Sequence, residues 1–426
     1  MLKAAGESWT SASAKRFLRQ LFMAAVASAD PLQILAPHLP ERPTGRCVVV
    51  GAGKAAGAMA RAVEDAWPEV DLTGIVVTPY GYRAPTERIV VREAAHPVPD
   101  AASEAAARAI LGAVANLSAD DLVLALISGG GSSVMTLPAP GLTLTDKQIT
   151  NRALLASGLD IRTMNAIRKR LSAVKGGRLA AAAAPARVVT LGISDIPGDN
   201  PAAIASGPTV FDDAAALDLG PAIARLEQSL PRSVIECLRR PPTVMQPSSH
   251  NSFRMIATPA QALQAAARVA RDAGLDAIIL GDSLEGEASE LGAQMAAFGQ
   301  RRVDTPTVFL SGGETTVTIG DRKAGRGGRN TEFLLSLARA LNGARSVWAL
   351  AGDTDGEDGA NGGAAGAVID PSTIERGRLQ GLDINESLVG HDSGTYFERL
   401  DDLVITGPTL TNVNDFRAIL VIPEAG

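Results

Sequence analysis

The alternation of short, β-branched apolar runs with Ala-rich stretches constrains the fold of this chain most strongly. In the first half, the apolar runs cover residues 46–51, 74–78, 88–92, 121–128 and 187–194. Helical patterns fill the gaps between them, which is the signature of repeated βαβ units. We therefore expect an α/β protein whose N-terminal domain is a Rossmann-like parallel α/β/α sandwich.

A Pro- and Ser-rich segment, residues 239–252, has no periodicity and is expected to be a linker. A chain of 426 residues is too long for one core, so we expect domains over 1–238 and 253–426. Two later runs, 307–311 and 315–320, are too close together for a helix between them. They predict a hairpin or corner, and hence a mixed sheet in the C-terminal α/β domain. The other later runs are 253–257, 277–281, 346–351, 402–406 and 418–422.

Charge and hydropathy argue against two classes of partner. The formal net charge is -6 and there is no dense Lys/Arg block, so we expect no nucleic-acid partner. No stretch approaches the ~20 apolar residues of a membrane span. The segment after Lys15-Arg16 resembles a signal peptide, but its helical period and the stop at Asp30-Pro31 favour an amphipathic helix. Cys47 and Cys237 have no metal-binding spacing, which favours a reducing, cytoplasmic location.

The turn "GAGK" that follows the first apolar run suits an anionic ligand. Gly51 and Gly53 satisfy the glycine fingerprint of dinucleotide-binding folds, but the next run ends in "TPY", 78–80, without a ribose-binding carboxylate. Lys54 adds a cation to the backbone N–H groups of a helix start, which favours phosphate. A tight turn with a solvated lysine is the alternative.

A second turn, "LISGGGSSVM", places Ser128, Gly129, Gly130, Gly131, Ser132 and Ser133 after a buried strand. Such an open backbone favours a phosphate or carboxylate site, with a hinge as the alternative. The following basic segment predicts one helix over 160–180. Its apolar stripe is Ile161, Met164, Ile167, Leu171 and Val174. The adjacent face is equally consistent with solvated surface or an anion site, and carries Asn165, Arg168, Lys169, Ser172 and Lys175.

Carboxylates follow two other strands. Asp195 comes after the run at 187–194, where a carboxylate can bind a metal or accept a proton from a substrate hydroxyl. Asp353 and Asp355 lie in a Gly-rich turn that does not match the calcium-loop pattern. They are our candidates for Mg²⁺, which usually takes one or two protein carboxylates plus phosphate oxygens.

The segment 311–338 brings acidic, basic and glycine residues together. Glu314 follows Gly312 and Gly313, and Arg329 lies among glycines immediately before Asn330. An arginine at a helix start suits a phosphate clamp. Because ligands of α/β sheets bind at the carboxyl ends of strands, these Gly-rich turns predict a large active site in the cleft between the domains.

Taken together, the motifs resemble the glycerate 2-kinase family, which has an N-terminal glycerate-kinase domain and a C-terminal MOFRL domain. The matching segments span nearly the whole chain and include "GAGKAAGAMA", "HPVPD", "LISGGGSS", "SDIPGDNPAAIASGPT", "LSGGETTVTI", "GRGGRNTEF" and "AGDTDGEDGANGGAAG". The resemblance implies transfer of the γ-phosphoryl of ATP to the 2-hydroxyl of D-glycerate, giving 2-phosphoglycerate and ADP, with Mg²⁺ required.

The resemblance also implies roles for particular residues. Lys54 and Arg329 are the cations expected at the reacting centre, and Asp195 would orient or deprotonate the 2-hydroxyl. Arg168 or Lys175 would bind the carboxylate of glycerate. The full set of expected nucleotide- or substrate-binding residues is Gly51, Gly53, Ser128, Gly129, Gly130, Gly131, Ser132, Ser133, Asn165, Arg168, Lys175, Gly312, Gly313, Glu314 and Asn330.

Two other functions stay open at this point. An NAD(P)H-dependent hydroxypyruvate reductase, a name that some relatives carry, would need an acid/base, for which His96 and His391 are available. A non-catalytic carboxylate-binding protein would explain the basic turns but not the clustered aspartates. We expect small-molecule partners, with a homodimer as the assembly to test.

Overall fold

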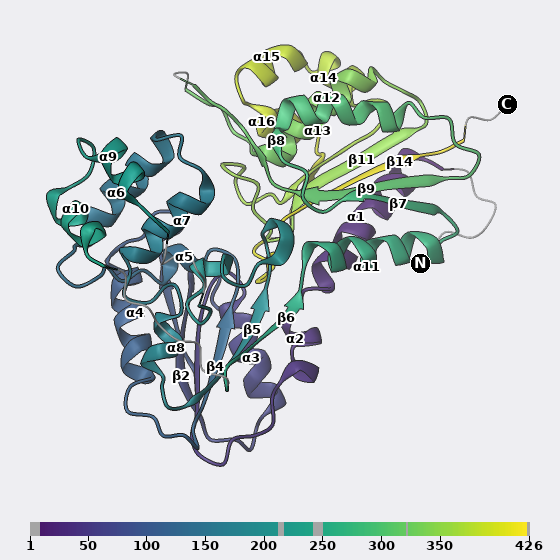
Figure 1. The fold of residues 1–426 in the computed structure, drawn as a ribbon. Helices are drawn as coiled ribbons and strands as arrows, with labels where there is room; N and C mark the ends of the chain where they lie inside the picture. The colour runs from purple at the N-terminus through teal and green to yellow at the C-terminus, as the bar shows by residue number, and fades with distance from the viewer. Residues whose placement is uncertain (1–8, 212–216, 242–249, 321–322, 424–426) are drawn as a thin grey trace. The chain divides into compact units, whose positions relative to one another are not determined.

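The protein divides into two compact units, which are described separately. The computed structural model describes residues 9–211, 217–241, 250–320 and 323–423. One unit comprises Asp30–Asp195 and Asp199–Ile256, and we call it the parallel-sheet unit. The other comprises Met1–Ala29, Ile196–Gly198 and Ala257–Gly426, and we call it the mixed-sheet unit. Figure 1 shows the fold with its element labels.

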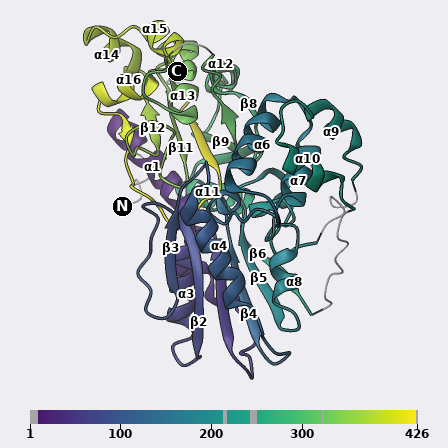
Figure 2. The same cartoon turned by 90° about the vertical axis from the view of Figure 1, so that its left-hand side faces the viewer.

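The parallel-sheet unit is built on one six-stranded sheet in the order β3-β2-β1-β4-β5-β6. Parallel pairing joins β1 through β5, as the sequence predicted. Helices α3 (Ala56–Ala66) and α4 (Ala101–Ala113) pack against this sheet (Figure 2). The strands are β1 (Cys47–Ala52), β2 (Leu72–Pro79), β3 (Val90–Ala94), β4 (Leu122–Ile127), β5 (Arg187–Ile193) and β6 (Ser252–Ala257).

A group of short helices in the same unit has its own small core. Buried apolar side chains such as Leu154, Ile167 and Leu226 hold it together. The helices are α6 (Leu144–Ala156), α7 (Ile161–Arg170), α9 (Gly220–Leu226) and α10 (Arg232–Arg239). The remaining helical segments of the unit are α2 (Pro31–Ile34), η1 (Ala36–His38), α5 (Gly131–Val134), α8 (Arg178–Ala182) and η3 (Ile204–Ser206), and η2 (Pro197–Asp199) lies at the boundary of the two units.

The single helix expected over 160–180 is wrong. Helix α7 ends at Arg170, because Ser172 then forms a bridge with Pro138, and Gly176 and Gly177 take left-handed φ values of 60° and 82°. A separate helix, α8, follows from Arg178. Ile161, expected in the apolar stripe, is 61% exposed at the first turn of α7.

The mixed-sheet unit contains a second six-stranded sheet, in the order β13-β12-β11-β14-β9-β7. In this sheet β7 and β9 pair in parallel and the other neighbouring strands pair antiparallel, so the predicted mixed sheet is confirmed. The run at 315–320 gives only two strand residues, and the sequence did not predict β12. The strands are β7 (Asp276–Gly281), β9 (Thr307–Gly313), β11 (Val347–Asp353), β12 (Gly366–Ile369), β13 (Leu403–Val404) and β14 (Asp415–Val421), and a separate ribbon pairs β8 (Gly286–Glu287) with β10 (Thr315–Thr316).

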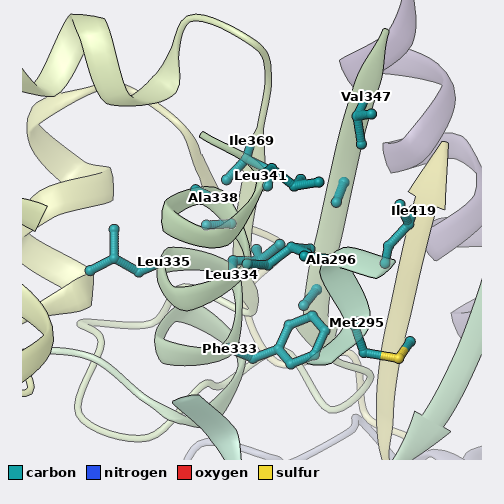
Figure 3. Packing of buried hydrophobic residues seen from close by; sticks show 14 of the residues in the cluster. Met295, Ala296, Phe333, Leu334, Leu335, Ala338, Leu341, Val347, Ile369 and Ile419 are labelled. Carbon is teal, nitrogen blue, oxygen red and sulfur yellow. The ribbon is translucent and has the colours of Figure 1, made fainter. Parts of the chain in front are cut away.

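Helices cover both faces of the mixed sheet. Helices α1 (Ser11–Ala27) and α11 (Pro259–Asp272) lie on one face, and α12 (Ala288–Gly299) and α13 (Arg329–Leu341) lie on the other (Figure 1). Figure 3 shows how Phe333 and Leu334 of α13 pack toward Ile419. Each fully buried side chain of this kind contributes about 1.5–3 kcal/mol. Three short helices complete the unit: α14 (Thr373–Leu379), α15 (Ile384–Val389) and α16 (Ser393–Arg399).

The unit boundaries differ from the domain ranges expected from the sequence. The first helix, α1, buries Phe17, Leu18 and Leu21 and packs on α11 and β11, so it belongs to the mixed-sheet unit and not to the expected domain 1–238. Strand β6 joins the sheet of the parallel-sheet unit, which moves the boundary from 253 to Ala257. Of the expected linker, residues 242–249 lie outside the described residues. No helix in the described ranges is long and apolar enough to span a bilayer.

Candidate functional site

The two predicted anion-binding turns lie side by side where the strand order of the parallel sheet reverses. Strands β1 and β4 are neighbours, β2 lies beyond β1, and β5 lies beyond β4. In open α/β sheets the crevice at such a switch point, outside the carboxyl ends of the strands, is where ligands bind. The Gly53-Lys54 turn follows β1 and the Ser128–Ser133 turn follows β4, so both occupy this position.

Hydrogen bonds connect these two turns. The backbone N–H of Lys54 donates to the carbonyl oxygen of Gly129 at 2.9 Å, and the N–H of Ala55 donates to Ser128 Oγ at 3.0 Å. Gly53 has a φ of 129°, and a Cβ there would lie 2.3 Å from Ser128 Oγ. Glycine is therefore required at this close approach. The seryl hydroxyl of Ser128 is buried and holds the lysine turn in place.

The side chain of Lys54 lies against the second turn. A Cβ built on Gly130 would be 3.5 Å from Lys54 Cγ and 3.2 Å from His96 Cδ2. Gly130 takes a φ of 77°, a left-handed conformation that favours glycine. Lys54 and His96 thus border the same Gly-rich turn, which fits the sequence-based interpretation of an anion site.

Ser132 connects this turn to a buried lysine. Lys175 Nζ donates to the carbonyl oxygen of Ser132 at 2.8 Å and to its Oγ at 2.6 Å. Ser132 Oγ also lies 2.9 Å from Ser206 Oγ, and Ser133 Oγ donates to the carbonyl oxygen of Pro97 at 2.8 Å. The loop that carries Lys175 therefore reaches the turn through tertiary structure, not as part of the helix that the sequence predicted.

A pocket of about 410 Å³ opens beside Ser132 and Ser133, entirely within the parallel-sheet unit. We call it the basic pocket, because four of its lining residues are cationic: Lys147, Arg152, Arg168 and Lys175. None of its thirteen lining residues, all in the described part of the chain, is Asp or Glu. The other lining residues are Pro97, Val98, Pro99, Ser132, Ser133, Thr136, Gln148, Asn151 and Leu155.

Burial and the repulsion of neighbouring cations lower the pKa of the two buried lysines in this pocket. Burial lowers the pKa of Lys147 to about 8, and Arg168 and Arg178 add to the shift. Burial also lowers the pKa of Lys175 well below its ordinary value, with Lys147 and Arg168 contributing. The ammonium groups are thus held in an environment that disfavours their charge. A bound anion would restore it.

Two of the expected site residues of this unit, Asn165 and Asp195, do not line the basic pocket. Asn165 is not among the lining residues, and its Oδ1 accepts a hydrogen bond of 3.3 Å from Arg168 Nη1. It therefore orients a lining arginine. Asp195 is half-buried two residues after the end of β5, at the same edge of the sheet as the turns after β1 and β4.

In the mixed-sheet unit, three neighbouring strands place two aspartates and a glycine in one row. Asp415 pairs with Asp353 on one side and with Gly313 on the other. Strand β14 is antiparallel to both neighbours, so its first residue lies at their carboxyl ends. Gly313 has a φ of 120°, and a Cβ there would lie 2.3 Å from the backbone of Leu284. This close approach requires glycine.

Arg329, the first residue of α13, binds three carboxylates at this row. Its Nε donates to Asp415 at 2.9 and 3.0 Å, Nη1 to Glu314 at 2.6 Å and Nη2 to Asp353 at 2.8 Å. Burial opposes the charge of Arg329, but Asp415, Asp353 and Glu314 together raise its pKa. The guanidinium is therefore charged and held in one orientation by these three carboxylates.

Asn330 is buried inside the start of α13. Its Nδ2 donates to Asp415 Oδ1 at 2.8 Å, and its backbone N–H donates to Asp358 Oδ1 at 2.9 Å. Asp358 also accepts the backbone N–H and the hydroxyl of Thr331, each at 2.9 Å. Asp358 thus caps the helix that carries Arg329. Asn330 supports the position of Arg329 because both side chains donate to Asp415.

The acidic turn after β11 is compact. Asp353 Oδ1 accepts the N–H of Asp355 at 3.1 Å, and Asp355 Oδ1 accepts the N–H of Glu357 at 2.8 Å. Within the described ranges, no cluster of three or more His, Cys, Asp and Glu side chains is arranged as a metal centre. Two adjacent carboxylates still fit Mg²⁺, because this ion takes its remaining ligands from phosphates and water. Asp353 and Asp355 would be the residues to hold it.

Sequence reasoning missed several residues of these sites. Asp415 lies in "NVNDFR", a polar group before the last apolar run, and would have been found by asking which strands are antiparallel. Asp358 lies in the same Gly-rich turn as Asp353 and Asp355 but was not among the candidate residues. Lys147 and Arg152 lie on α6, whose sequence carries no signal that a lysine there is buried.

The feature that a dinucleotide enzyme needs is missing at the first turn. Strand β2 ends at Pro79, with Thr78 buried before it and Tyr80 after it. The Tyr80 hydroxyl donates to the carboxylate of Asp100 at 2.8 Å, and Glu93 of β3 accepts the N–H of Gly81 at 2.8 Å. None of Thr78, Pro79 and Tyr80 is itself a carboxylate, so β2 does not carry the ribose-binding acid that NAD enzymes have at this point.

The fold and these turns define a two-unit α/β protein with clustered cations at the carboxyl ends of its strands. Residues 17–239 match the family described as "Domain of unknown function (DUF4147)", and residues 307–415 match the MOFRL family. The chain belongs to the glycerate 2-kinase family, in which these two domains occur together.

Three relatives illustrate the relationship. A protein of Agrobacterium vitis called a putative hydroxypyruvate reductase is 55% identical over 97% of this chain and 96% of its own length. The glycerate 2-kinase of Pyrococcus horikoshii is 39% identical, covering 90% of this chain and 89% of its own. The crystal structure of a glycerate kinase from Thermotoga maritima superposes with a TM-score of 0.84 at 35% identity, covering 96% of this chain and 100% of that chain.

Proposed function

We propose that this protein is an ATP-dependent glycerate 2-kinase, which phosphorylates the 2-hydroxyl of D-glycerate and releases 2-phosphoglycerate and ADP. Family membership supports the kinase activity. The observation that carries the proposal is the position of Lys54: a lysine on a Gly-rich turn at the switch point, hydrogen-bonded to the Ser128–Ser133 turn, with no ribose-binding acid on the following strand.

The proposed reaction is an in-line transfer. The 2-hydroxyl oxygen of glycerate forms a bond to the γ-phosphorus of ATP, and the bond from that phosphorus to the bridging oxygen breaks, leaving ADP. The proton of the hydroxyl goes to a carboxylate, for which Asp195 is our candidate. Lys54 and Arg329 neutralise charge on the transferring group, and the Ser128–Ser133 turn donates hydrogen bonds to it.

Asp353 and Asp355 are proposed to hold Mg²⁺ when the nucleotide is bound. The ion would neutralise phosphate charge, as in other phosphoryl transfers. The contact between Asp353 and Arg329 would link the ion-binding turn to the cation at the start of α13. We further propose a cytoplasmic location, small-molecule substrates and a homodimer as the assembly.

The second candidate is an NAD(P)H-dependent hydroxypyruvate reductase. The name of the Agrobacterium vitis relative favours it. The end of β2 argues against it, because Thr78, Pro79 and Tyr80 offer no carboxylate to a ribose.

A coupled assay tests the proposal. The protein is incubated with D-glycerate, ATP and Mg²⁺, and enolase is added without phosphoglycerate mutase. Formation of phosphoenolpyruvate without the mutase supports the 2-kinase. Formation only after the mutase is added means that the 3-hydroxyl is the acceptor. No product together with NADH oxidation by hydroxypyruvate would establish the reductase instead.

The role of Lys54 is tested with Lys54→Ala in the same assay. Removing one charge donor from a transition state costs about 10²- to 10³-fold in kcat. Lys54→Arg is the matched control, because it changes the side chain on the turn but keeps its positive charge. Near-normal turnover of Lys54→Ala would remove this residue from the mechanism.

A further inference from the structure

The basic pocket has two chemically different surfaces. Part of the lining is cationic and buried, since Lys147 and Lys175 are only 5% and 4% exposed. Another part consists of two apolar side chains that are left open to solvent: Val98 is 62% exposed and Leu155 is 73% exposed. A ligand that fills this pocket therefore has a strongly anionic part and a flat or apolar part.

The charge in the pocket exceeds what a single carboxylate could balance. The two hydrogen-bond acceptors of Lys175 are the carbonyl and hydroxyl oxygens of Ser132, and both are neutral. Lys147 donates to the carbonyl oxygen of Leu171 at 3.3 Å, which is neutral as well. Buried charges are normally paired. Two buried lysines, with the half-buried Arg168 and the exposed Arg152 beside them and no carboxylate in the lining, therefore point to an anion of several charges.

The size of the pocket leads to the same conclusion. Its volume of about 410 Å³ lies within the range of cofactor and nucleotide sites, and is far larger than a three-carbon acid fills. The hydroxyl of Ser132, on the Gly-rich turn at the switch point, accepts a hydrogen bond from Lys175. Polyphosphate bound by Lys175 would therefore extend toward the Lys54 turn.

We propose that the basic pocket is the nucleotide site, with the triphosphate of ATP bound by Lys147, Lys175 and Arg168 and the nucleoside resting on Val98 and Leu155. The inference rests on the proposed kinase function and deepens it. It moves Arg168 and Lys175 from the carboxylate of glycerate, their expected ligand, to the nucleotide. Arg152, on the exposed side of α6, adds a further contact for phosphate.

The experiment compares two variants of the pocket wall with two matched controls on α7. Arg152→Gln and Leu155→Ala change exposed side chains that line the pocket, whereas Arg162→Gln and Ile161→Ala change exposed side chains that do not. The KM for ATP and the KM for D-glycerate are measured for each. Binding of ADP and of inorganic tripolyphosphate is measured by calorimetry. Circular dichroism confirms folding.

The two wall variants are expected to differ from each other. Arg152→Gln raises the KM for ATP and weakens tripolyphosphate about tenfold, as the loss of a charge-assisted hydrogen bond predicts. Leu155→Ala raises the KM for ATP and weakens ADP about threefold to tenfold, yet leaves tripolyphosphate unchanged. The KM for D-glycerate stays constant in both, and the α7 controls match the wild type.

Other outcomes overturn the proposal. A rise in the KM for D-glycerate alone would assign the pocket to the acceptor acid. If Arg152→Gln and Leu155→Ala match the α7 controls in every measurement, the nucleotide does not bind in the pocket. Failure of the kinase function would appear separately, as a wild type without turnover, and the calorimetry of ADP would still test the pocket.

Discussion

Asp415 accepts a hydrogen bond from Arg329 Nε through both carboxylate oxygens, at 2.9 and 3.0 Å. The same carboxylate accepts from Arg417 at 2.7 Å, and it is fully buried. The pairing depends on β14, because only an antiparallel strand brings its first residue to the carboxyl ends of β9 and β11. Asp415 is thus a positioning residue that orients the cation at the start of α13.

Asp415→Asn is expected to destabilise the protein by about 3–5 kcal/mol, because it leaves the buried guanidinium of Arg417 without an anion. Turnover falls as well, since Arg329 loses its orientation. Glu314→Gln is the matched control. Glu314 also binds Arg329, but its side chain is 53% exposed, and ion pairs with an exposed partner contribute about 0–1 kcal/mol to stability. Urea unfolding and kcat measure both effects. Equal losses in the two variants would contradict the positioning role.

Gly53→Ala is expected to disrupt the lysine turn. The new Cβ would lie 2.3 Å from Ser128 Oγ and 2.5 Å from the Ser128 carbonyl oxygen, in addition to the strain of a φ of 129°. The expected loss is about 2 kcal/mol or more, with reduced turnover. Gly141→Ala isolates the strain, because Gly141 has a φ of 87° and no neighbour within 4 Å. Thermal unfolding measures the stability of both variants. A loss of stability in Gly53→Ala no larger than in Gly141→Ala would rule out the clash.

The sequence predicted strands β1 and β4 well because their apolar runs are fully buried, and each strand lies within one residue of its expected bounds. The helix that begins at α7 was predicted to end ten residues too late. The 3.6-residue period of apolar residues continues past Arg170, whereas the helix ends there. The bridge from Ser172 to Pro138 that ends the helix is a contact between distant segments, which no local pattern reveals.

The candidate site was predictable where it lies on turns. Lys54, Ser132 and Arg329 all follow glycines, and the Gly-rich pattern marks them. Lys147 was not predictable, since it is buried against a segment distant in the sequence, where the carbonyl oxygen of Leu171 accepts its hydrogen bond. Asp415 was missed because its importance comes from strand register, which the sequence does not encode locally.

The titration of Asp358 is expected to appear in the pH dependence of stability. Burial raises the pKa of Asp358 to about 6, against the opposing hydrogen bonds from Asn330 and Thr331 and with Asp415 adding to the shift. Between the unfolded value of about 3.8 and the folded value, the folded state holds a proton that the unfolded state has lost. Its contribution to stability is therefore present at low pH and is lost as pH rises through 6.

Asp358→Asn removes this titration. The free energy of unfolding of the wild type minus that of the variant should fall by up to about 3 kcal/mol between pH 4 and pH 7, because two pKa units correspond to that amount. Urea unfolding across this range measures the difference. A difference that is constant or grows with pH would mean that the folded state does not raise the pKa of this carboxyl.

Binding of nucleotide to the basic pocket is expected to take up protons. In the free protein, burial lowers the pKa of Lys147 to about 8, with Arg168 and Arg178 adding, so part of the Lys147 population is neutral at that pH. A bound polyphosphate raises this pKa, because it favours the ammonium form. A fraction of a proton therefore enters with each ADP near pH 8, and affinity falls as pH rises further.

Calorimetry in buffers of different ionisation enthalpy measures the proton count. ADP is suited to this, because its phosphates are already ionised above pH 8 and contribute no protons of their own. Lys147→Arg is the matched variant, since an arginine stays charged and takes up no proton. Proton uptake by Lys147→Arg on binding ADP should fall to the part contributed by Lys175. Burial lowers the pKa of Lys175 as well. Proton release on binding, or equal uptake in both proteins, would show that Lys147 does not meet the phosphates.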